Sequence, residues 1–123
     1  MPSEAKLLGA WGEDAASDYL KKHGYAVIGR NFSCRLGEID IIAEKGNYIV
    51  FAEVKLRKDD RFAAAAEFVT AAKQRRIILA AELWLSRNPT QRQPRFDVIE
   101  VYAPEGWHTK NPVINHIEDA FEL

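Results

Sequence analysis

Residues 37–55 read GEIDIIAEKGNYIVFAEVK, two runs rich in isoleucine, valine and phenylalanine that are separated by Lys-Gly-Asn at 45–47. Short apolar runs on either side of a glycine-containing turn are typical of a β-hairpin. We therefore predict one strand over 36–44 and a second over 48–57. This hairpin decides where the charged side chains of the segment point.

Four charged side chains are expected on one face of this hairpin. Side chains alternate across a strand, so residues two apart share a face. If the turn has two residues, Asp40 lies opposite Glu53 and Glu38 lies opposite Lys55. A change of one residue in the register would put the two sets on different faces.

The two central carboxylates have apolar sequence neighbours, although strand interiors are usually poor in acidic residues. Buried like charges repel one another unless a cation lies between them, and Mg²⁺ binds a few carboxylate oxygens together with water and phosphate oxygens. Lys55 would then position the attacking water or stabilise charge on a phosphate. A cross-strand ion pair of Glu38 or Glu53 with Lys55 on a solvated sheet face explains the same pattern.

Outside the hairpin, hydrophobic periodicity and turn residues predict five further segments. They are helices over 6–23 and 62–87, strands over 25–32 and 96–102, and a short fifth strand over 107–110. Pro89 and Pro94 are expected to bound a linker before the strand at 96–102. The acidic tail ending at Phe121 is expected to pack on the sheet. The order α-β-β-β-α-β favours a mixed sheet covered by helices.

The chain has 123 residues, of which 47% are hydrophobic, so we predict a single domain over 1–123. It contains no run of about 18 apolar residues and no secretory signal, so we expect a cytoplasmic protein without a membrane partner. The single cysteine, Cys34, has no partner for a disulfide and no metal-finger spacing.

The charge is unevenly distributed. Residues 55–95 carry 10 Lys and Arg against 4 Asp and Glu, whereas the flanking segments are acidic. A basic block suits a phosphate-binding face, although a solvated helix face rich in arginine would look the same. The candidate phosphate contacts, each equally explained by solubility, are Arg57, Lys58, Arg61, Lys73, Arg75 and Arg76.

Five ordered motifs in the sequence resemble those of a known family. They are Gly12-Glu13, GEIDII at 37–42, FAEVK at 51–55, KQRR at 73–76 and RFDV at 95–98. The set resembles the uncharacterised bacterial family UPF0102, also called the YraN family. That family is similar to the PD-(D/E)xK, restriction-endonuclease-like nucleases and, in its layout, to archaeal Holliday-junction resolvases. The resemblance implies an α/β, three-layer restriction-endonuclease-like fold with a central mixed β-sheet of four to five strands flanked by helices.

The resemblance also implies roles for individual residues. Asp40 and Glu53 match the two metal carboxylates, Lys55 matches the signature lysine, and the carbonyl of Val54 is an extra ligand. Glu13 matches a carboxylate of the first helix, and it borders the apolar stripe predicted for that helix. The implied cofactor is Mg²⁺ or Mn²⁺.

Two positions are less clear. Gln74 matches a helix glutamine of several nuclease branches, but it equally suits a polar position at the edge of a buried stripe. Residues 63–66 are four alanines where family members usually carry a glycine and often a proline, which puts the loop before the second helix in doubt. An alanine-rich surface there would also suit a homodimer contact.

The implied function is a metal-dependent endonuclease-like protein that acts on DNA, including branched or damaged structures. The alternative is a non-catalytic nucleic-acid-binding module that keeps the nuclease fold. Two other residues are predicted to be structural: Asp97 as a buried partner near Arg95, and Trp84 as part of the core.

Overall fold

The predicted hairpin is present. The computed structural model describes residues 2–58 and 69–122. Within it, β2 (Gly37–Lys45) and β3 (Tyr48–Arg57) pair antiparallel in the predicted register, from the turn out to Ile41 and Ala52. Gly46 has a φ of +58°, which a two-residue hairpin turn with glycine in first position requires.

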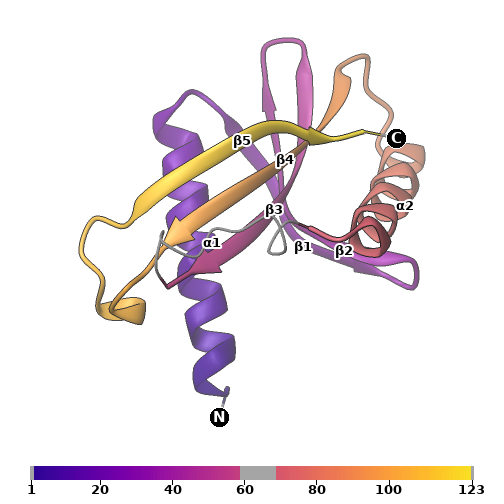
Figure 1. Cartoon of the computed structure of the whole chain (residues 1–123). Coiled ribbons are helices and arrows are strands. Elements are labelled where there is room, and N and C mark those ends of the chain that lie inside the picture. The colour runs from indigo at the N-terminus through magenta and orange to yellow at the C-terminus, as the bar shows by residue number, and fades with distance from the viewer. Residues whose placement is uncertain (1, 59–68, 123) are drawn as a thin grey trace.

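Three further strands complete a five-stranded mixed sheet (Figure 1). They are β1 (Ala26–Cys34), β4 (Gln93–Tyr102) and β5 (Val113–Phe121), and the spatial order is β1-β2-β3-β4-β5. The β3–β4 pair is parallel and the other three pairs are antiparallel. A parallel pair needs a long crossover, and a helix lies within the connection from β3 to β4.

One helix packs on each face of the sheet, which gives three layers (Figure 1). On one face, α1 (Glu4–Lys22) buries Ala16 and Leu20 against the sheet. On the other face, α2 (Ala71–Arg87) buries Ile77 and two alanines. This is the three-layer, restriction-endonuclease-like α/β class that the sequence predicts.

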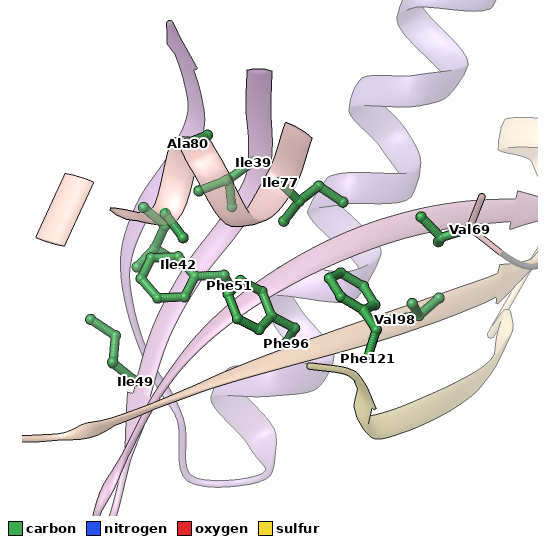
Figure 2. Packing of buried hydrophobic residues seen from close by; sticks show 11 residues of the cluster. Ile39, Ile42, Ile49, Phe51, Val69, Ile77, Ala80, Phe96, Val98 and Phe121 are labelled. Atoms are coloured by element: carbon green, nitrogen blue, oxygen red, sulfur yellow. The ribbon is translucent and has the colours of Figure 1, made fainter. Parts of the chain in front are cut away.

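Aromatic rings fill the core between the sheet and α2 (Figure 2). Phe51 stacks on Phe96 at 5.7 Å between ring centroids, and Phe96 stacks on Phe121 at 5.3 Å. Trp84 meets Phe51 edge to face at 5.9 Å, so its predicted place in the core is confirmed. Phe121 lies near the end of β5, so the acidic tail does pack on the sheet, as its edge strand.

The second helix begins later than predicted. Thr70 has extended backbone and its side chain accepts a hydrogen bond from the backbone amide of Lys73, which makes Thr70 the N-cap. The helix therefore starts at Ala71 and not at residue 62. The alanines at 63–66, and with them the predicted dimer contact, lie outside the described residues.

Two predictions for the C-terminal third are wrong. The segment predicted as a strand at 107–110 begins with a 3₁₀ turn, η3 (Gly106–His108), in which Gly106 has a φ of +60°. Pro94 does not end a linker but is the second residue of β4, where a proline near a strand start is tolerated.

Among the described helices, none combines the length and the apolar character that a membrane crossing needs.

Candidate functional site

The site begins where β2 and β3 separate. Their backbone pairing ends at Ile41 and Ala52, so the predicted ladder pair of Asp40 with Glu53 does not form. Instead, the carboxylate of Asp40 accepts a hydrogen bond from the backbone amide of Val54, with Oδ2 2.8 Å from the nitrogen. A side chain thus holds the strands together where the backbone ladder has ended.

Glu53 is buried, with 3% of its surface exposed, and two lysines face it. Nζ of Lys73 lies 2.8 Å from Oε1 of Glu53, and Nζ of Lys55 lies 3.8 Å from the same oxygen. Lys55 was predicted beside the carboxylates, whereas Lys73 was predicted only as a phosphate contact. The closer ammonium is therefore that of Lys73, which was not predicted to be part of the metal site.

Burial and the neighbouring carboxylate of Glu53 both disfavour the ionised form of Asp40. Burial raises the pKa of Asp40, and the negative charge of Glu53 raises it further, so that it reaches about 7. The amide of Val54 opposes this rise, while the charge of Glu13 and a hydrogen bond to Glu53 add to it. An acid with a pKa this far above its ordinary value, beside a specific charged partner, marks a candidate functional site.

The same negative charges also raise the pKa of Lys73, which favours its charged form. Its hydrogen bond with Glu53 raises the pKa of the ammonium, burial opposes the rise, and the charges of Glu53, Asp40 and Glu38 support it. Lys73 therefore carries a positive charge next to a group of carboxylates, and it balances part of their charge.

Glu13 borders the site from α1, on the core side of the helix as predicted. Its side chain is 18% exposed and lies 3.6 Å from Nη2 of Arg30. Asp14 and Asp18 of the same helix are exposed, and Asp14 forms a 2.8 Å ion pair with Arg30. The charge of Glu13 reaches Asp40, and its ion-pair partner among the described residues is Arg30 of β1.

Gln74 and Gly37 position the helix that carries Lys73. The side-chain amide of Gln74 donates to the carbonyl of Val69 at 2.9 Å, which fixes the segment entering α2. A Cβ on Gly37 would lie 2.3 Å from the backbone oxygen of Arg76, so only glycine allows α2 to lie this close to β2. The sequence identified Gly37 as part of a motif. Its contact with α2 became visible only when the position of that helix on the sheet was known.

A cavity of about 330 Å³ opens between the start of β2 and the start of α2. It is lined by both strand and helix residues: Glu38, Thr70, Ala72, Lys73, Arg76 and Ile77. Arg75 and Arg76 are exposed on α2, and Lys58 is exposed just beyond β3. Exposed cations thus lie at the cavity and on α2, whereas Lys58 lines a separate pocket with Tyr102 and Lys110.

Arg57 requires a correction and Arg61 cannot be placed. Arg57 lies 3.0 Å from Oε2 of Glu100, which is itself buried, and its side chain is 12% exposed. That ion pair joins β3 to β4 and leaves Arg57 poorly presented to phosphate. Arg61 lies outside the described residues.

Asp97 belongs to a separate buried network. It is 0% exposed and accepts hydrogen bonds from Arg95, His116 and the backbone amide of Asp119. Burial alone would raise its pKa, but the hydrogen bonds from His116 and Arg95 outweigh burial and lower it. The structural role predicted for Asp97 fits this network, which ties β5 to β4.

The donor chemistry of the site suits a divalent cation with few protein ligands. Among residues 2–58 and 69–122, no three His, Cys, Asp or Glu side chains are grouped so that they could hold a metal ion. Mg²⁺, however, is commonly bound by one or two carboxylates, with water and substrate phosphate completing its shell. Asp40 and Glu53 supply that number of carboxylates, and the ammonium of Lys73 already lies beside them as a cation.

Comparison with known proteins supports the resemblance read from the motifs. A family model described as "Uncharacterised protein family UPF0102" matches residues 12–101. A UPF0102 protein of Caldicellulosiruptor saccharolyticus is 46% identical over 117 residues, which cover 93% of this chain and 96% of that protein. A UPF0102 protein of Rhodococcus opacus is 44% identical over 115 residues, which cover 93% of this chain and 95% of that protein. The matched span contains every candidate metal ligand.

Proposed function

The chain belongs to the uncharacterised protein family UPF0102, and we propose that it hydrolyses phosphodiester bonds of DNA with the help of Mg²⁺ or Mn²⁺. One observation carries this proposal above all others. Two neighbouring carboxylates, Asp40 and Glu53, lie beside the ammonium groups of Lys55 and Lys73, and the charge of Glu53 raises the pKa of Asp40. Paired carboxylates and a nearby lysine are the groups that metal-assisted phosphoryl chemistry needs.

Asp40 and Glu53 are the residues that would hold the cation in this proposal. When bound, a divalent cation supplies Lewis-acid polarisation of the phosphate and of the attacking water. Glu13 and the carbonyl of Val54 are proposed as further oxygen donors, as the family resemblance implies. The amide of Val54 already holds Asp40 in place, so this segment fixes the direction of the first carboxylate.

Lys55 is the residue proposed to act on the reacting groups. Its ammonium, 3.8 Å from Glu53, is available to orient the water and to compensate the negative charge that grows on the phosphate. The water oxygen bonds to phosphorus, the bond to the leaving oxygen breaks, and the proton released by the water is passed through solvent to that oxygen. Gln74 contributes by fixing the start of α2 through Val69.

The proposed DNA-binding face adjoins the cavity at the start of α2. Arg75 and Arg76 are its exposed cations, and Lys73 lies at its inner edge. Contacts of this kind position the phosphate backbone without reading the sequence. A cytoplasmic location, where the protein meets DNA, is part of the same proposal.

Cleavage assays test the proposal directly. Wild type, Asp40→Asn, Glu53→Gln and Asp18→Asn are incubated with branched, single-stranded and duplex DNA, with Mg²⁺ or Mn²⁺ and with a chelator. Asp18 is exposed on the same helix as Glu13 and is a cleaner control than Asp14, which binds Arg30. Cleavage that needs metal and is lost in the first two variants, but not in Asp18→Asn, is the expected result.

A binding module without turnover is the second candidate. It is favoured by the 2.8 Å contact of Lys73 with Glu53, which neutralises the buried carboxylate without any metal. It predicts DNA binding that weakens with salt, no cleavage under any metal condition, and no effect of Asp40→Asn on affinity. The same set of assays therefore separates the two functions.

A further inference from the structure

Lys73 makes the shorter of the two lysine contacts with Glu53. Its Nζ is 2.8 Å from Oε1 of Glu53, within hydrogen-bond distance, whereas Nζ of Lys55 is 3.8 Å from the same oxygen. The Glu53 side chain is 4% exposed, and a buried carboxylate is strongly destabilising without a charged partner. Lys73 therefore supplies the positive charge on which the folded site depends.

Two contacts of α2 place the ammonium of Lys73 beside Glu53. Thr70 caps α2 through the backbone amide of Lys73, which sets the residue in the first turn of the helix. The close approach of Gly37 to the backbone of Arg76 then brings that first turn against the start of β2. The contact thus follows from the placement of the helix and is more than a chance meeting of two flexible side chains.

The same lysine also has a route away from the carboxylate. Its side chain is 41% exposed, and it lines the cavity of about 330 Å³ together with Arg76. A lysine has a long, flexible stem, so its ammonium can leave the carboxylate without moving the helix. Outside the site, it would join the exposed cations of α2.

We propose that Lys73 is an exchangeable internal cation: its ammonium neutralises Glu53 when no metal is present, withdraws when a divalent cation binds the carboxylates, and then faces the phosphate backbone. This exchange couples metal binding to the number of cations that α2 presents to the phosphate backbone. The inference rests on the proposed metal site, and it adds a competition between a side chain and the metal for one position.

Calorimetric titration of Mn²⁺ and Mg²⁺ into wild type, Lys73→Met and Arg87→Met tests the competition. Methionine keeps the length of the side chain without its charge, and Arg87, exposed at the far end of α2, controls for the loss of one positive charge. Removing the competing ammonium should tighten metal binding by roughly tenfold, and Arg87→Met should leave it unchanged. In a chelator, Lys73→Met should melt at a lower temperature than wild type, and saturating Mn²⁺ should restore most of the loss.

Labelling of the wild-type protein tests the withdrawal without any substitution. Acetylation of Lys73 by acetic anhydride, followed by mass spectrometry, should become several-fold faster with saturating Mn²⁺ than in a chelator. Lys21, which is exposed near the end of α1 and belongs neither to the site nor to the proposed DNA-binding face, serves as the internal reference.

The outcomes separate the inference from the proposed function. Metal binding of equal or lower affinity in Lys73→Met, or labelling of Lys73 that does not respond to bound metal, overturns the exchange and leaves the metal site standing. No metal binding in wild type or in Lys73→Met overturns both. Binding that appears only in Lys73→Met shows that a divalent cation does not displace Lys73 in the wild-type protein, and it overturns the exchange.

Discussion

The backbone amide of Val54 donates a hydrogen bond to Oδ2 of Asp40 at 2.8 Å, beyond the last ladder pair of the β2–β3 hairpin. This contact fixes Asp40 near Glu53, although burial and the charge of Glu53 raise the pKa of Asp40 to about 7. The fold thus holds a carboxylate where its ionised form is disfavoured. Such an arrangement lowers stability and is typical of sites kept for function.

Replacing Asp40 with asparagine should stabilise the metal-free protein near pH 8. The folded-state pKa of about 7 lies above the ordinary 3.8, so ionisation of Asp40 lowers stability as the pH rises from about 4 through 7. Asparagine removes this loss and can still accept the hydrogen bond from Val54. In thermal unfolding with a chelator, Asp40→Asn should melt about 2–5 °C higher than wild type at pH 8 and equally at pH 4. A lower melting temperature at pH 8, with Asp18→Asn unchanged, would contradict the assignment.

Gly37→Ala should disturb the packing of α2 on β2. The new Cβ would lie 2.3 Å from the backbone oxygen of Arg76, so the helix must shift, at a cost of about 1–3 kcal/mol. Gly9→Ala is the matched control, because a Cβ on Gly9 meets nothing within 4 Å and alanine favours the helix interior by about 0.5–1 kcal/mol. In urea unfolding, Gly37→Ala should lower the free energy of unfolding and Gly9→Ala should raise it. Equal effects would argue against the close approach.

Asp97→Asn should be costly at neutral pH and much less so in acid. Loss of the charge leaves Arg95 without its buried partner, at a cost of about 3 kcal/mol or more. The pKa of Asp97 in the folded state is lowered from the ordinary 3.8. The ionised carboxylate therefore stabilises the fold fully above that pH, and this stabilisation is lost as the pH falls through the folded-state pKa. In urea unfolding, the difference in unfolding free energy between wild type and Asp97→Asn should be smaller at pH 3 than at pH 7. A gap that is constant with pH, or equally large in the surface control Glu105→Gln, would refute this role.

Arg75→Ala and Arg76→Ala should weaken DNA binding in a salt-dependent way. Each arginine that neutralises one phosphate of duplex DNA contributes about 0.9 to the slope of log affinity against log salt. Fluorescence anisotropy over a salt series should show a shallower slope for both variants, and Arg87→Ala should keep the wild-type slope. Unchanged slopes for all three variants would place the DNA elsewhere.

The hairpin and the site it carries were predictable because they depend on short-range rules. Alternation along two strands and a two-residue turn were sufficient to bring Asp40, Glu53 and Lys55 together. The end of the ladder before Asp40 was not predictable, because no local sequence signal marks where β2 and β3 separate. The contact of Lys73 with Glu53 was not predicted either, because it depends on where α2 lies on the sheet.

Two differences between the sequence analysis and the structure have separate causes. The start of α2 at Ala71 depends on the cap at Thr70, and the alanines before it concealed that boundary by their high helix propensity. Arg57 was predicted from its charge, while its buried partner Glu100 lies on a strand that is distant in sequence. The ion pair became visible only when the parallel pairing of β3 with β4 was known.

Calorimetric titration of Mg²⁺ into wild type and Asp40→Asn at pH 8, with Asp18→Asn as control, tests the central claim most directly. The account predicts binding at one site in wild type and in Asp18→Asn, and its loss in Asp40→Asn. Absence of binding in wild type at any Mg²⁺ or Mn²⁺ concentration reached, in protein that is shown to be folded, would contradict it.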